Sequence, residues 1–557
     1  FAVGYTDFDL NPQGVERVSL IKRWRLEPKP KDVEKYKRGE LVEPAKPIVF
    51  YIDPLTPKKW IPYLIQGVND WQKAFEKAGF KNAIYAKVPN PKDDPEWSLE
   101  DARFSAVVYK PSDVPNASGP SIADPRTGEI LESHINWYHN VMKLLNDWYF
   151  VQASPNDPRA RKADFDDELM GQLIRFVSSH EVGHTLGLRH NYGSSSTVPV
   201  ENLRNNSWLK ANGHTPSIMD YARFNYVAQP EDKISIDNLM PRIGDYDDWA
   251  IEWGYRRFYN YNSPEKEKTF INKWTIEKLQ NPRLWFGTES NPFDPRSQSE
   301  QVGDNPMIAG KYGVKNLQRV IDNLEAWSTK PNEDYSVLAD RYNQVSGQFS
   351  RYLGHVAKYI GGVMETPKTV EQKGAVYELV SKTEQKEALK FLNDYAFTTP
   401  NWILKKDVLN KINRTPVDVV SNLQNGVLNR ILMNGVLENL NKGESIDINA
   451  YSLFDYLQDL KSNIFSELKT SSKIDIYRRN LQRSFVDNLL SKTDSATSAS
   501  IIRMGSSDNS DVKALVRGTL RDIRNEASKA ASQYSDSVTK YHLEDLVYRI
   551  DKALEVK

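Results

Sequence analysis

Apolar residues in the first part of the chain follow both strand-like and helix-like patterns. Runs of β-branched and aromatic residues at 47–52, 82–88 and 104–109 predict three short strands. Between the first two, the apolar positions of 60–79 recur at helical spacing and end at a glycine, which predicts a helix. The expected order of elements is therefore strand, helix, strand, strand.

The next stretch predicts a hairpin and two helices. Two extended runs flank the sequence DPRTG at 124–128, where an early proline and a late glycine suit a tight turn. The aromatic-rich segment 137–151 predicts an amphipathic helix that packs in the core rather than serving as a substrate platform. Asp166 and Asp167 then suit the positive end of a new helix. Its expected buried stripe is Leu169, Leu173, Phe176 and Val177.

The second half of the chain has a helical pattern. Residues 259–313 are rich in turn-forming residues and predict an irregular linker. Beyond it, the expected helical segments are 314–327, 335–360, 383–391, 416–440, 451–468, 474–490, 510–531 and 538–556. No catalytic constellation stands out in them, so the chemistry is expected before the linker.

Residues 180–190, HEVGHTLGLRH, carry the candidate chemistry. On a helix, His180 and His184 lie one turn apart on the same face, which suits two ligands of one zinc ion. Gly187 lets the chain turn, so that His190 supplies a third ligand. Three protein ligands leave a fourth position for water, as in catalytic zinc sites. Glu181 lies off the ligand line and is placed to take a proton from that water.

This motif is more specific than its first five residues alone. HExxH by itself occurs by chance in about one chain in a hundred of this composition, and the added glycine and third histidine make chance far rarer. Three of the eight histidines of the chain fall within these eleven positions. The alternative, a helix whose histidines are merely buried and hydrogen-bonded, is disfavoured.

Composition narrows the possible partners. Lys plus Arg equals Asp plus Glu, at 74 each, so nothing indicates nucleic acid as a partner. No apolar run is long enough for a transmembrane segment. The absence of cysteine excludes disulfides and cysteine zinc sites. Because the chain starts at Phe1 rather than methionine, we expect a mature or trimmed chain.

The motif resembles the zinc-binding sequence of the metzincin metallopeptidases, which also have a methionine turn. The sequence SIMDY at 217–221 is similar to that turn. The resemblance implies that Met219 forms an apolar floor under the zinc and that Tyr221 is a displaceable ligand or an oxyanion donor. Asn191, after the third histidine, departs from the best-known branches. Longer stretches resemble a group of large exported bacterial metzincins, most specifically over about 45–258.

The resemblance implies a metzincin-like α+β catalytic domain, with a twisted mixed sheet and an active-site helix, followed by a large mainly α-helical domain. We expect 1–45 to be a connector or the remnant of an upstream domain, 46–258 the zinc peptidase domain, 259–313 a linker and 314–557 the helical domain. By the same resemblance, the region of the predicted hairpin supplies an edge strand to which a peptide substrate adds.

The functional hypothesis is a secreted, zinc-dependent endopeptidase with one catalytic Zn²⁺, acting on proteins or peptides with Glu181 as general base. Two alternatives stay open: a non-catalytic zinc-containing surface binding or scaffold protein, and a zinc hydrolase of a non-peptide amide. Export to the cell surface, periplasm or medium is implied mainly by resemblance. Calcium at Asp245, Asp247 and Asp248 is conceivable, but without EF-hand spacing a solvated helix start is favoured.

Overall fold

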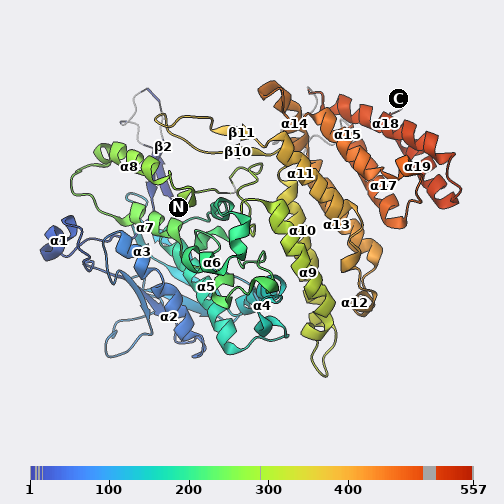
Figure 1. Cartoon of the computed structure of the whole chain (residues 1–557). Coiled ribbons are helices and arrows are strands. Elements are labelled where there is room, and N and C mark those ends of the chain that lie inside the picture. The colour runs from blue at the N-terminus through green and yellow to red at the C-terminus, as the bar shows by residue number, and fades with distance from the viewer. Residues whose placement is uncertain are drawn as a thin grey trace. The chain divides into compact units, whose positions relative to one another are not determined.

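The computed structural model describes residues 2–6, 9, 13–14, 17–288, 290–493 and 510–554 (Figure 1). The chain forms two compact units, the first made of Phe1–Thr288 and Ser297–Asn305, the second of Glu289–Arg296 and Pro306–Lys557. The first unit combines a mixed sheet with helices, and the second is mainly helical. This confirms the predicted fold class, while the predicted domain boundaries stay a prediction.

A five-stranded mixed sheet organises the first unit, in the strand order β4-β3-β5-β9-β6. The strands are β3 (Ile48–Ile52), β4 (Ile84–Lys87), β5 (Ser105–Lys110), β6 (Ala117–Ser118) and β9 (His134–Tyr138). The first four in spatial order are parallel, and β6 runs antiparallel to β9 at one edge. Three of these strands match the strands predicted from the sequence.

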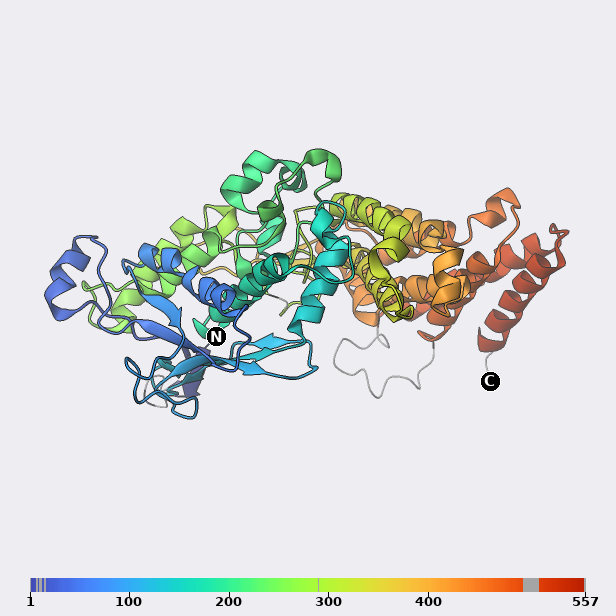
Figure 2. The same cartoon turned by 90° about the horizontal axis from the view of Figure 1, so that it is seen from below.

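Helices α2 (Ile61–Asn69) and α5 (Asp167–Thr185) pack against each other and against this sheet (Figure 2). The predicted helix at 60–79 is interrupted, because α2 is followed by a separate short helix, α3 (Gln72–Lys77). A Cβ on Gly67 of α2 would lie 2.6 Å from Ser178 Cβ of α5. The two backbones therefore approach closely, which fixes α5 against α2.

The predicted hairpin forms as β7 (Ile122–Ala123) and β8 (Ile130–Glu132), but as a separate two-stranded sheet. The edge strand of the main sheet is instead β6, which comes just before it in the chain. The helix expected at 137–151 is α4 (Val141–Ala153). Its predicted first residues belong to β9, because alternating burial at 134–138 is a strand pattern.

The N-terminal stretch packs onto the first unit. Strands β1 (Ala2–Thr6) and β2 (Arg17–Ile21) pair antiparallel, and a short helix α1 (Val33–Lys37) follows. Trp24 Nε1 donates to the carbonyl of Thr185 at the end of α5, at 2.9 Å. Trp24 therefore ties this stretch to the end of α5, while the expectation that 1–45 is a connector or the remnant of an upstream domain stays a prediction.

The segment 259–313, expected to be an irregular linker, contains regular helices. It contains helix α8 (Pro264–Lys278), whose N-cap is Ser263, and the start of α9 (Pro306–Ser328). Helix α8 has no buried residue, so its hydrophobic pattern gave little signal. Between α8 and α9, residues 279–288 and 297–305 belong to the first unit. Residues 289–296 and the chain from Pro306 onward belong to the second.

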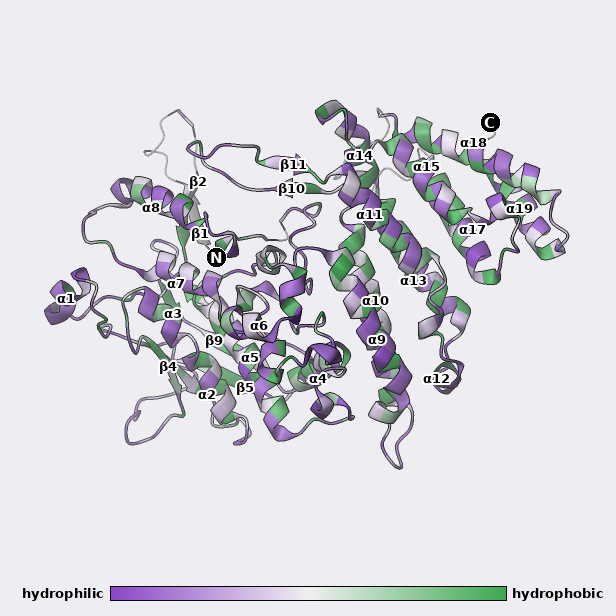
Figure 3. Cartoon of the chain, in the orientation of Figure 1, coloured by the Kyte–Doolittle hydropathy of each residue, from purple (hydrophilic) through white to green (hydrophobic). Residues whose placement is uncertain are grey.

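The second unit is built from paired helices (Figure 1). Its helices are α9, α10 (Ser336–Ala357), α11 (Lys382–Leu392), α12 (Lys406–Lys411), α13 (Pro416–Ile431), α14 (Asn434–Ile446), α15 (Leu453–Ile464), α16 (Glu467–Thr470), α17 (Ile476–Leu490), α18 (Val512–Ala531) and α19 (Ser537–Leu554). Helix α9 packs on α10, α13 on α17 and α18 on α19. The ribbons carry apolar and polar faces (Figure 3), as helices packed on one side do.

Most predicted helical segments match these helices. The segment 416–440 splits into α13 and α14, the segment 510–531 matches α18, and the end predicted at 556 lies in 555–557, outside the described residues. A short hairpin, β10 (Val363–Glu365) with β11 (Tyr377–Leu379), was not predicted. No helix in the described part of the chain is long and apolar enough to cross a bilayer.

Candidate metal centre

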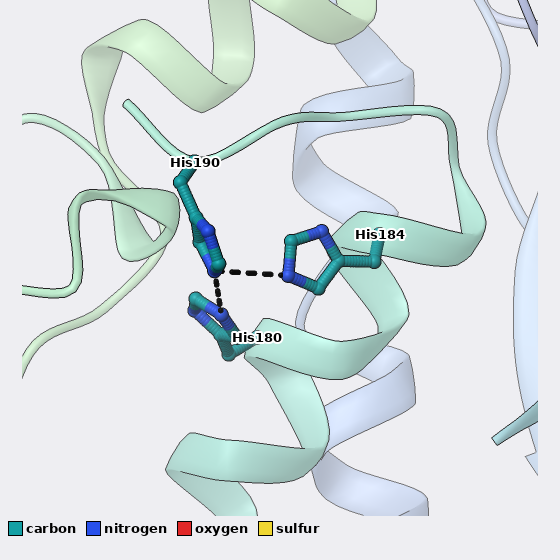
Figure 4. A group of neighbouring side chains, drawn as sticks. All are labelled: His180, His184 and His190. Atoms are coloured by element: carbon teal, nitrogen blue, oxygen red, sulfur yellow. Dashed lines mark hydrogen bonds between the residues drawn. The ribbon is translucent and has the colours of Figure 1, made fainter. Parts of the chain in front are cut away.

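Helix α5 presents two of the three motif histidines from one face. Asp166 caps its start, because its carboxylate accepts from the N–H of Leu169 at 2.9 Å. The helix ends at Thr185, and Gly187 follows with φ +93°, a conformation that side-chain-bearing residues rarely adopt. This turn reverses the chain and returns His190 to the two helical histidines (Figure 4).

The Nε2 atoms of the three histidines converge. His190 Nε2 lies 3.2 Å from His180 Nε2 and 3.1 Å from His184 Nε2. Nitrogens held tetrahedrally at about 2.0–2.1 Å from zinc are about 3.3 Å apart, which agrees with these distances. In the described part of the chain, this is the one group of three or more such side chains close enough to hold a metal ion together.

The positions of the protons on these rings favour a bound cation over hydrogen bonds between the three Nε2 atoms. His180 Nδ1 lies 2.8 Å from the carbonyl of Ile218, and His184 Nδ1 lies 3.1 Å from the carbonyl of Leu188. Because a carbonyl only accepts, each Nδ1 carries the proton, and the neutral ring leaves Nε2 as a bare acceptor. Burial lowers the pKa of His180 and His184, which favours these neutral rings.

The three Nε2 atoms therefore carry too few protons to satisfy one another by hydrogen bonds. His190 Nε2 carries at most one proton, which cannot satisfy both partners, and burial lowers the pKa of His190 to about 4. A divalent cation at their meeting point would satisfy all three nitrogens. The donor set thus fits zinc, for which neutral imidazole is a common ligand.

Glu181 lies next to the histidines but is not one of the converging group. It is 8% exposed, and burial raises the pKa of its carboxyl to about 7, while a hydrogen bond from the Gly119 backbone opposes this shift. A bound cation nearby would lower that pKa. A Cβ on Gly119 would lie 2.3 Å from the Glu181 carbonyl oxygen, so the chain after β6 presses directly against α5.

A cavity of about 550 Å³ opens over these groups. It is lined by Asn116, Ala117, Ser118, Gly119, Pro120, His180, Glu181, His184, Arg189, His190, Tyr192, Tyr221 and Thr288. The three histidines and the one buried carboxylate thus share this cavity with the whole of β6. Strand β6 pairs with β9 on one side and is the last strand of the sheet on the other.

The predicted methionine turn lies beside the histidines. Met219 is fully buried, and a Cβ on Gly183 of α5 would meet its Sδ at 2.3 Å. The Tyr221 ring centroid lies 5.7 Å from that of His180 and 5.2 Å from that of His190. Tyr221 has φ +65°, an unusual value for a residue with a side chain, and such strain is concentrated at functional sites.

A family model described as Met-zincin matches residues 162–472, more than half of the chain. The chain belongs to the Met-zincin family. The match begins just before α5 and includes the three histidines and the methionine turn, so it confirms the resemblance drawn from the sequence. Searches among curated proteins and among solved structures gave no match.

In this Met-zincin, Asn191 connects the third histidine to two other segments. Its N–H donates to the carbonyl of Met219 at 2.8 Å. Its side-chain amide donates to the carbonyl of Trp285 at 2.9 Å and accepts from the N–H of Gly287 at 2.8 Å. These contacts fasten the third-histidine loop to the methionine turn and to the segment predicted to be a linker.

Residues 297–305 of the Met-zincin, which we call the strap, contact the methionine turn through Glu300. Glu300 N–H donates to the carbonyl of Tyr221 at 3.1 Å, and its buried carboxylate pairs with Arg223 at 2.6 Å. The Arg223 guanidinium also lies over the Trp148 ring. The sequence did not predict this arrangement, because the strap is about eighty residues from the turn and has no regular pattern.

One acidic residue of the Met-zincin was misjudged from the sequence, whereas Asp245 is exposed at its helix start, as predicted. Asp247 was predicted to be solvated at a helix start, but it is fully buried at the start of α7 (Asp245–Tyr255). It accepts from the Ser217 hydroxyl at 2.6 Å and from the Ile218 N–H at 2.8 Å. Asp245 pairs with Arg283 instead, so these acids do not converge on a calcium site.

Tyr192 is a further residue that the sequence reasoning missed. Its hydroxyl lies 2.9 Å from His190 Nδ1, and it lines the cavity. When Nε2 faces a metal, His190 Nδ1 carries the proton and donates to this hydroxyl. The sequence offered one signal for this role, because Tyr192 lies two residues after the third histidine.

Tyr192→Phe is therefore expected to weaken zinc binding about tenfold, because the orienting partner of His190 is lost. Competition with a fluorescent zinc chelator measures this affinity. Tyr259→Phe, at an exposed tyrosine, is the matched control and should leave it unchanged. Equal affinities for Tyr192→Phe and wild type would show that the hydroxyl does not orient the ligand.

Proposed function

We propose that this Met-zincin is a zinc-dependent endopeptidase in which His180, His184 and His190 hold the metal and Glu181 is the general base. The observation that carries the proposal is the convergence of three proton-poor Nε2 atoms in one cavity with a buried carboxylate. A structural zinc site needs neither the cavity nor the carboxylate.

Zinc supplies positive charge that polarises a peptide carbonyl and lowers the pKa of a water molecule toward about 7. Glu181 takes a proton from the attacking water on its carboxylate and later gives it to the leaving amine. Burial raises the pKa of this carboxyl, and a bound cation would lower it again and so keep the carboxylate ready to accept a proton. The Gly119 N–H holds the carboxylate in place from the side of the sheet edge.

The edge strand β6 favours an extended peptide as the substrate. Both residues of β6 line the cavity, and among the described residues the strand has a ladder partner only in β9. An extended peptide can add to the other side of β6 through main-chain hydrogen bonds, which recognise backbone rather than a particular side chain. This mode suits cleavage within a chain, and it disfavours a small non-peptide amide.

Tyr221 and Met219 complete the proposed machinery. The Tyr221 ring lines the cavity beside two of the histidines, so its hydroxyl is proposed to donate to the oxyanion. Met219 lies buried against α5 at Gly183 and is proposed to keep the floor under the metal apolar. Export of the chain is part of the proposal and rests on the family resemblance.

The test is digestion of unfolded casein by the zinc-loaded chain, with products identified by mass spectrometry. We expect internal cuts that stop on addition of a chelator and return when zinc is added back. Removal of single terminal residues would contradict endopeptidase action. Metal binding without any cleavage of casein or of a mixed peptide library would instead favour a zinc-containing binding protein.

A further inference from the structure

Arg189 brings a positive charge to the cavity. It lies between His184 and His190 in the sequence, lines the cavity and is exposed to solvent. Among the described residues, no carboxylate lies within ion-pair distance of its guanidinium. The other arginine near the turn, Arg223, differs because it is buried in an ion pair with Glu300.

The guanidinium of Arg189 is held by a hydroxyl and an aromatic ring. Its Nη2 donates to the Thr288 hydroxyl at 3.2 Å, and its Cζ lies 5.9 Å from the centre of the Phe286 ring. That ring stacks on Tyr246, with centroids 6.0 Å apart. A positioned cation loses less side-chain freedom when it binds a ligand, so such a group is suited to recognition.

The charges around the cavity favour an anionic group. Glu181 is the one carboxylate among its lining residues, and the proposed zinc would add two positive charges beside Arg189. Among the described residues, Thr288 takes only one of the Arg189 N–H groups, so the others can reach a ligand. A guanidinium binds a carboxylate through two parallel hydrogen bonds, which gives it preference for that group over a neutral amide.

We propose that Arg189 selects substrates that carry a carboxylate close to the cleaved bond. This inference rests on the proposed peptidase function and adds the substrate class. The carboxylate has two possible sources, an aspartate or glutamate side chain or the C-terminus of a short peptide. Both offer the same planar acceptor, so the experiment must separate them.

The experiment uses two sets of peptides and the full zinc-loaded chain. In the first set, a single glutamate or glutamine is moved through an otherwise neutral peptide with an amidated C-terminus. In the second set, neutral peptides carry a free or an amidated C-terminus. Cleavage is measured as kcat/KM with wild type, and binding is measured as Kd with Glu181→Gln, which is expected not to cleave. Arg189→Gln and Arg189→Lys are compared in both backgrounds.

We expect the carboxylate peptide to be preferred about tenfold over its neutral partner at one position, in kcat/KM and in Kd. Arg189→Gln should reduce this ratio to about one, and Arg189→Lys should give an intermediate ratio because the forked donor is lost. Arg103→Gln is the matched control, since Arg103 is an exposed arginine outside the cavity, and it should keep the wild-type ratio.

The outcomes separate this inference from the proposed function. Cleavage without any carboxylate preference, or a preference that survives Arg189→Gln, overturns the role of Arg189 and leaves the peptidase standing. A preference in binding that depends on Arg189, with no cleavage by wild type, supports carboxylate recognition by Arg189 and overturns the peptidase. A preference confined to the first set identifies a side chain, and one confined to the second identifies a C-terminus.

Discussion

Glu181→Gln is expected to keep zinc and to lower kcat by at least about a hundredfold. General acid–base catalysis contributes about 10²–10⁴-fold, and an amide cannot take the proton that the carboxylate takes. The substitution keeps the shape of the side chain, and the amide oxygen can still accept from the Gly119 N–H. The three histidine Nε2 atoms are untouched, so the metal affinity should change little.

Stability gives this prediction a second readout. A buried carboxylate costs free energy when charged, whereas the amide is neutral, so the variant should be no less stable than wild type. Glu168→Gln, the same change at an exposed position of the same helix, is the matched control and should retain wild-type turnover. Cleavage of casein by Glu181→Gln at the wild-type rate would show that Glu181 is not the base.

Gly187→Ala is expected to destabilise the turn by about 2–5 kcal/mol and to abolish tight zinc binding, the largest structural effect we predict. Two costs add. The backbone at φ +93° is unfavourable for alanine, and the new Cβ would lie 2.1 Å from the carbonyl oxygen of Lys22. Because His190 follows this turn, any rearrangement moves the third ligand.

Because the chain holds two compact units, a single unfolding free energy is not well defined. Hydrogen exchange of peptides covering 184–192 and zinc affinity are better measurements for this variant. Gly254→Ala is the matched control: nothing lies within 4 Å of its Cβ, and alanine suits helix α7. Normal zinc affinity and normal exchange in Gly187→Ala would mean that the turn tolerates a side chain.

The local chemistry of the motif could be predicted from the sequence because it depends on short-range geometry. The spacing of His180, His184 and Gly187 determines which groups share a helix face and where the chain turns. The strands at 47–52 and 104–109 were likewise visible, because they are short runs rich in β-branched and aromatic residues. The family resemblance rests on this same local motif, and the resemblance in turn implied the fold class.

The supports of the site could not be predicted, because they come from distant segments without periodicity. Trp24 and Lys22 pack against the end of α5, Asn191 reaches 285–287, and Glu300 holds Tyr221. Turn-forming residues within 259–313 indicated a linker, yet backbone groups of Trp285 and Gly287 satisfy the buried side chain of Asn191. Only the folded structure shows which polar, turn-rich segments hold the site in place.

The measurement that tests the central claim most directly is zinc content and zinc K-edge absorption of the purified full chain. The account predicts one zinc per chain, with three nitrogen ligands and one oxygen ligand at about 2.0–2.2 Å. Loss of the bound zinc in His190→Ala would assign the third ligand. Failure of the wild-type chain to bind zinc, or a zinc signal unchanged by that substitution, would contradict a catalytic metal held by these three histidines.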